Sequence, residues 1–210
     1  MTSSEGDHLE IERKYDAEAG FVLPDLGRLP ELGGRRIAKP RRIYLSATYF
    51  DTEDFDLLRH KVTLRRRVGG DDEGWHLKLP VREDARQELH APLGDGTDSS
   101  VPARLADQVK QITAGKRLRP VAILDTERTV VRVPGPPADA QVEVADDKVT
   151  ATRFDETGSK PMTWREIEVE VLSEGSGATA MLETVGRALR EAGARPSASG
   201  SKLARALAPG

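Results

Sequence analysis

A charged segment close to the start of the chain has the residue types of a site for metal ions and phosphate groups. Residues 8–14 read HLEIERK. As a β-strand, this segment places Glu10, Glu12 and Lys14 on one face, because successive side chains of a strand point to opposite faces. Two carboxylates can hold a divalent cation, and an ammonium group can bind a phosphate attached to it. The segment therefore predicts a strand whose polar face carries chemistry.

The same one-sided charge recurs along the chain, and its sign differs from strand to strand. Basic residues share a face in the middle segments, and acidic residues share a face in the first and last ones. In residues 75–79, for example, His76 and Lys78 lie opposite the apolar Trp75, Leu77 and Leu79. The other charged faces carry Arg65 and Arg67, Arg128 and Arg132, Glu143, and Glu166, Glu168 and Glu170.

The ordinary interpretation of such a pattern is an antiparallel sheet with one face in water. Two details disfavour it here: these faces contain almost no Thr, Ser or Gln, and the signs are segregated by strand. Three glutamates on one strand face repel each other unless metal ions or other cations balance them. We therefore expect a closed barrel with a wet, charged interior, since a dry interior would leave unpaired charges at high cost.

In that arrangement the apolar strand faces point outward and need helices to cover them. Residues 179–192 supply the clearest amphipathic helix, with Met181, Leu182, Val185 and Leu189 on one face and Gly193 at its end. Trp75 and Trp164 are expected to pack on the outer face of the barrel.

Turn residues divide the rest of the chain into strands and a few helices. This order predicts an α+β protein with an eight-stranded antiparallel β-barrel and helices packed on its outside, in one domain over residues 1–210. The expected helices are 53–59, capped by Thr52, and 102–114, while 199–207 is expected to be a short basic tail. The expected strands are 9–15, 42–50, 61–68, 75–79, 87–91, 122–133, 141–149 and 164–172.

Composition excludes several functional classes. The chain has 210 residues with 32 Lys and Arg against 35 Asp and Glu, a net charge of −3 that disfavours a general nucleic-acid binder. It has no cysteine, no apolar run long enough to span a membrane and no signal-peptide core. We therefore expect a cytoplasmic protein without a nucleic-acid or membrane partner.

The ordered set of motifs resembles the CYTH superfamily of triphosphate tunnel metalloenzymes, named for class IV adenylyl cyclase and thiamine triphosphatase. Residues 10–14 match its ExExK signature, and the resemblance covers nearly the whole chain. It implies an eight-stranded tunnel that binds a triphosphate and a divalent metal, Mg²⁺ or Mn²⁺. The other matching segments are 49–52 (YFDT), 64–67 (LRRR), 74–78 (GWHLK), 166–168 (EIE) and 201–202 (SK).

The resemblance also implies a role for individual residues. Two assignments of metal ligands stay open. Glu170 continues the face of Glu166 and Glu168 and could replace one of them, and Asp147 shares the face of Glu143 and could replace it. The residues expected to act in catalysis are Glu10, Glu12, Lys14 and Glu168. The phosphate ligands implied are Lys14, Arg65, Arg67, Lys78, Arg128 and Lys202, and the metal-binding carboxylates are Glu10, Glu12, Glu143, Glu166 and Glu168.

The function that follows is metal-dependent hydrolysis of a small triphosphate, with inorganic tripolyphosphate as the leading substrate. Thiamine triphosphate hydrolysis, adenylyl cyclase activity and non-catalytic polyphosphate binding are the alternatives. Members of the superfamily are often followed by a helical CHAD domain, so a CHAD partner and a longer parent chain are also expected alternatives. No general base is assigned.

Overall fold

The computed structural model describes residues 8–32, 35–82, 85–94, 100–135, 141–154, 161–172 and 177–208. Its strands pair antiparallel in the order β5-β4-β3-β2-β6-β7-β8-β1, and β5 also pairs with β1. That last pairing closes the barrel, as the alternating charge predicts, and the short β9 joins β1 at its edge. The strands are β1 (His8–Ala17), β2 (Arg41–Asp51), β3 (Thr63–Val68), β4 (Gly74–Arg82), β5 (Ala85–Ala91), β6 (Arg119–Pro134), β7 (Gln141–Arg153), β8 (Met162–Val171) and β9 (Arg195–Pro196).

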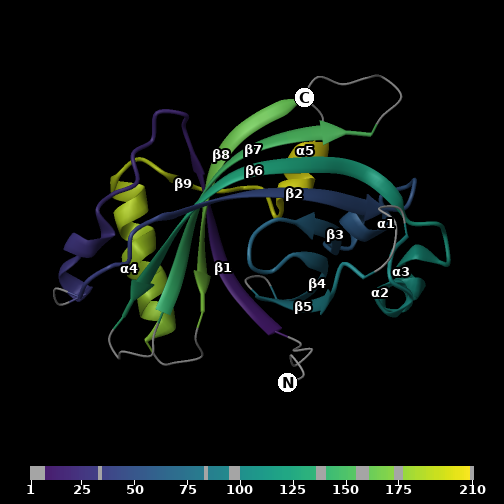
Figure 1. The fold of residues 1–210 in the computed structure, drawn as a ribbon, viewed down its shortest axis with the longest axis horizontal. Helices are drawn as coiled ribbons and strands as arrows, with labels where there is room; N and C mark the ends of the chain where they lie inside the picture. Colours follow the sequence, from purple (N-terminus) through teal and green to yellow (C-terminus); the bar gives the residue numbers. More distant parts are fainter. Residues whose placement is uncertain are drawn as a thin grey trace.

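Helix α4 (Ala178–Glu191) covers the outer face of the long strands, on the left of Figure 1. Its Met181, Leu182, Val185 and Leu189 are buried against outward-facing valines and Ile167 of β6 to β8, as the helical periodicity predicts. Gly186 lets this helix lie directly on β1, because a Cβ there would stand 2.2 Å from the Tyr15 hydroxyl. Two short 3₁₀ turns, η1 (Leu26–Arg28) and η2 (Pro30–Leu32), precede β2.

A second core lies under the short helices at the right of Figure 1. Trp75 and Leu77 of β4 pack there on Leu57 and Leu105, so Trp75 is on the outer face as predicted. The helix expected over 102–114 is instead two helices that meet at the buried Val109, whose backbone leaves the helical region. The two helices are α2 (Ala103–Gln108) and α3 (Lys110–Thr113), and the third short helix over this core is α1 (Asp56–Arg59).

The C-terminal tail forms a helix, α5 (Lys202–Leu207), which the sequence analysis did not predict. Ser201 caps it by accepting a hydrogen bond from the Ala204 amide. Its Leu203 and Ala206 are buried among inward-facing residues of β2, β6 and β7, so α5 closes one end of the barrel interior. Trp164 packs against this cluster and under Arg205, which corrects its predicted place on the outer face.

Among the described residues, the helices are all too short or too polar to cross a lipid bilayer.

Candidate active site

The barrel encloses a cavity of about 260 Å³ with a mainly polar wall. Most of the residues that line it are charged, although β2 contributes Ile43, Leu45 and Tyr49, and most of the alternating apolar residues of the other strands pack outside. The six cations expected to bind phosphate all line this cavity, although they come from four strands and α5. They are Lys14, Arg65, Arg67, Lys78, Arg128 and Lys202.

Lys202 stands at the centre of an acidic group at the inner end of the cavity. Its Nζ lies 2.9 Å from Asp147 Oδ2, 2.7 Å from Glu166 Oε1 and 2.6 Å from Glu168 Oε1. All four side chains are nearly or fully buried. The ammonium group of Lys202 therefore supplies the positive charge that stabilises the three buried carboxylates. Helix α5 thereby both closes the barrel and delivers a cation into it.

Arg128 and Lys14 complete this network. The Arg128 guanidinium donates two hydrogen bonds of 2.7 Å to Asp147 and one of 2.6 Å to Glu168. Lys14 Nζ lies 3.1 Å from Glu168 Oε1 and 2.9 Å from Glu12 Oε1. Burial alone would raise the pKa of Glu168, but Lys202, Lys14 and Arg128 hold it well below its ordinary value. Glu168 is therefore ionised at neutral pH.

A second network lies on the opposite wall. Lys78 Nζ is 2.5 Å from Glu10 Oε1, and the Arg65 guanidinium donates to the Tyr49 hydroxyl at 3.4 Å. Glu88 of β5 faces the same cavity, and although burial would raise its pKa, Lys78 and its hydrogen bond to His76 lower it. Glu88 is therefore an acid of the cavity wall that the sequence analysis did not select.

The sequence contains a signal for Glu88 as a residue of the cavity wall. Residue 88 lies in the strand expected over 87–91, and applying the alternation to Leu89 and Ala91 would have placed Glu88 on the polar face. His76 shares its face with Lys78, as predicted, and its Nδ1 lies 2.8 Å from Glu88 Oε1. What the sequence did not contain was the pairing of β5 with both β4 and β1, which brings the two residues together.

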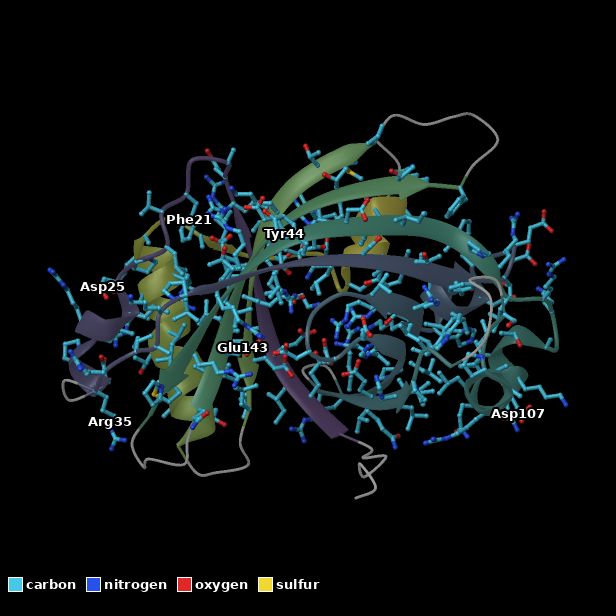
Figure 2. All side chains as sticks on the ribbon, viewed as in Figure 1. Phe21, Asp25, Arg35, Tyr44, Asp107 and Glu143 are labelled. Carbon is cyan, nitrogen blue, oxygen red and sulfur yellow. The ribbon has the colours of Figure 1, made fainter. Side chains whose placement is uncertain are left out.

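A row of glutamates crosses three strands between the two networks. Glu170 is the cross-strand partner of both Glu12 and Glu143, which places it on the acidic face beside β1. Whether it takes the place of Glu166 or Glu168 as a metal ligand stays a prediction. Within the described part of the chain, no ion pair reaches Glu170. Burial and the charge of Glu10 raise the pKa of Glu170 to about 8. Figure 2 shows Glu143 near the middle of the molecule.

The excess of negative charge at this row is what a divalent cation would balance. Glu10 Oε2 is buried without a hydrogen-bond partner, and the pKa of Glu170 is raised first by burial and then by the charge of Glu10. Asp147, Glu166 and Glu168 also have carboxylate oxygens within 4.8 Å of one another, but Lys202 already contacts all three. Among the described residues, that group is the one whose carboxylates approach this closely. Glu10, Glu12 and Glu170 lie on neighbouring strands, and a hard divalent cation would have to draw their carboxylates closer together.

The remaining predicted acids have mixed positions. Glu10, Glu143 and Glu168 line the cavity, whereas Glu12 and Glu166 lie in its wall, paired with Lys14 and Lys202 respectively. The structure thus brings the predicted residues together around one cavity. Their binding of phosphate and metal stays a prediction.

A family model described as "CYTH domain" matches residues 8–206. The chain is 40% identical over 209 residues to two Mycobacterium tuberculosis proteins, "Uncharacterized protein Rv2226" of strain H37Rv and "Uncharacterized protein MT2285" of strain CDC 1551. Each match covers 95% of this chain and 40% of the relative, so the chain spans less than half of their length.

A crystal structure of a candidate adenylate cyclase from Bacillus halodurans has a similar fold. It superposes with a TM-score of 0.60 at 18% identity, covering 97% of this chain and 100% of that one. At this level of identity the likeness concerns the fold alone.

Proposed function

We propose, because the chain belongs to the CYTH domain family, that it is a metal-dependent triphosphatase that hydrolyses inorganic tripolyphosphate. The observation that carries this proposal is the convergence of Lys14, Arg65, Arg67, Lys78, Arg128 and Lys202 on one cavity. Charge-assisted hydrogen bonds from Arg and Lys are the usual means by which proteins hold phosphate groups. A chain of three phosphates offers each of these cations an anionic oxygen.

The polar lining supports an inorganic substrate over one with an aromatic ring. Among the described residues that line the cavity, Tyr49 is the aromatic one, and its hydroxyl accepts a hydrogen bond from Arg65. Thiamine and adenine rings are ordinarily recognised by stacking on aromatic or apolar side chains. The lining described here has four aliphatic side chains, Ile43, Leu45, Val130 and Leu172, and is otherwise mostly charged.

The side chains would act by holding the phosphates and stabilising the charge that develops as the bond to the leaving phosphate breaks. Lys14 and Arg128 are fixed by Glu168 and other carboxylates, so their positive ends are preorganised for this task. Mg²⁺ or Mn²⁺, held by Glu10, Glu12 and Glu170 with Glu143 and Glu168 nearby, would neutralise phosphate charge and lower the pKa of a bound water.

We propose that residues 1–210 form a single CYTH domain. The M. tuberculosis relatives are longer than this chain, which is compatible with a second domain such as CHAD in a parent protein. That the longer protein has a CHAD domain as a partner of the CYTH domain is likewise a proposal.

The direct test is release of orthophosphate from tripolyphosphate, thiamine triphosphate and ATP, each with Mg²⁺, with Mn²⁺ and with a chelator. We expect turnover of tripolyphosphate to exceed that of the other two, and we expect the chelator to abolish it. The physical reason is the role proposed for the metal, which would lower the pKa of the attacking water and balance charge in the transition state, whereas the six cations of the cavity can hold the phosphates without it.

Each alternative has its own outcome in this assay. Preferred turnover of thiamine triphosphate would replace the substrate proposal, and formation of cyclic AMP from ATP would favour a cyclase. Tight binding of polyphosphate with no turnover of any substrate would favour the non-catalytic binding module.

A further inference from the structure

The mouth of the cavity carries two carboxylates that the proposed reaction does not use. The turn between β3 and β4 contributes Asp71 and Asp72, and both line the cavity. Asp72 forms an ion pair with Arg67, whereas Asp71 pairs with Arg41 at the rim. Lys14, Lys78, Arg128 and Lys202 also pair with carboxylates, but those partners are largely buried, whereas the partner of Arg67 is exposed.

Arg67 and Asp72 differ sharply in their surroundings. The Arg67 side chain is 6% exposed, and the Asp72 side chain is 65% exposed. Burial and the charge of Arg65 lower the pKa of Arg67 to about 10, and Asp72 opposes this shift. The buried guanidinium thus needs an anion, and Asp72 can move into solvent at little cost when another anion takes its place.

The backbone around Asp72 is held in place, so the exchange needs only a side-chain rotation. Its carbonyl oxygen lies 2.9 Å from His76 Nε2 and accepts a hydrogen bond from Arg67 Nη2 at 3.3 Å. Gly69 and Gly70 begin the turn with φ of +85° and +80°, and a Cβ at Gly69 would lie 2.3 Å from the Tyr44 carbonyl oxygen. The turn is therefore packed closely on β2.

We infer that Asp72 is an intramolecular competitor for phosphate: it occupies Arg67 in the ligand-free protein, yields to a phosphate group of the substrate, and returns when the product leaves. This inference rests on the proposed function and adds a residue that sets how tightly the outer phosphate is held. Asp72 touches Arg67 and acts through it, so it is a positioning residue.

The test is calorimetric titration of the purified protein with sodium tripolyphosphate in the presence of a chelator. Asp72→Asn is expected to lower the Kd about fivefold, because the phosphate no longer displaces a charged partner from Arg67. Asp71→Asn is the matched control: it removes the same charge from the neighbouring position at the mouth, and the Kd should stay within about twofold.

A double-mutant cycle separates this effect from a general change of charge. In the Arg67→Ala background, Asp72→Asn should leave the Kd for tripolyphosphate unchanged, since the guanidinium for which Asp72 and phosphate compete is absent. The inhibition constant of orthophosphate during turnover should fall about fivefold in Asp72→Asn alone.

Equal shifts in Asp72→Asn and Asp71→Asn, no shift in either, or a gain that persists without Arg67 would overturn the inference. Tripolyphosphate that binds and responds to Asp72→Asn but is never hydrolysed would overturn the proposed triphosphatase activity alone. Failure of tripolyphosphate to bind the unmodified protein would overturn both.

Discussion

Replacing Arg67 by alanine is expected to lower kcat for tripolyphosphate by about 10²- to 10³-fold, with the fold retained. This is the loss seen when a preorganised donor to a developing negative charge is removed, roughly 2.7–4 kcal/mol. The prediction is clean because the counter-ion of Arg67 is the largely exposed Asp72, which water can solvate once the guanidinium is gone. Lys14→Ala, by contrast, leaves the buried Glu12 and Glu168 each short of a cation.

The measurement is steady-state phosphate release at saturating Mg²⁺, with circular dichroism to verify the fold. Arg66→Ala is the matched control, since Arg66 precedes Arg67 in β3, lies on the opposite face of the strand and does not line the cavity. We expect that variant to stay within about threefold of the unmodified protein. An Arg67→Ala protein with full activity would remove Arg67 from the phosphate ligands.

Replacing Lys202 by alanine is expected to destabilise the fold by about 3–5 kcal/mol, the usual cost of removing one partner from a buried ion pair. Asp147, whose side chain is fully buried, and Glu166 and Glu168 would then face each other with less positive charge. Because Lys202 is the first residue of α5, the same change should loosen the helix that closes the barrel.

Urea unfolding measures this loss, and two further variants interpret it. Arg205→Ala removes a partly exposed cation from the same helix, and we expect it to cost about 1 kcal/mol or less. Adding Glu166→Gln to Lys202→Ala should recover part of the lost stability, because it removes one of the orphaned charges. A Lys202→Ala protein as stable as the original would show that the ammonium group does not hold the acidic cluster together.

The fold was largely predictable because the charge alternation was regular. The polar faces of β1, β3, β4, β6 and β8 were assigned correctly from period two alone, since a barrel puts every such face on the same side. The face of α4 followed in the same way from period 3.6. Predicted strand ends fell short by up to four residues, as at β7, which runs on to Arg153.

The features that sequence reasoning missed depend on contacts between distant segments. Helix α5 has only six residues, so its formation relies on packing inside the barrel and on Lys202 meeting Asp147. Trp164 shares its face with Glu166, so the alternation that placed Glu166 inside contradicted the expected packing of Trp164 on the outer face. The competition between Asp72 and phosphate was invisible because a Gly-Gly-Asp-Asp turn reads as an ordinary hairpin connection.

A crystal structure of the protein grown with tripolyphosphate and Mn²⁺ tests the central claim most directly. We expect the three phosphates inside the barrel in contact with Lys14, Arg67 and Lys78, Asp72 turned away from Arg67, and anomalous density for Mn²⁺ beside Glu10, Glu12 and Glu170. Tripolyphosphate bound on the outer surface, with Arg67 still paired to Asp72 and the cavity free of both anion and metal, would contradict the account.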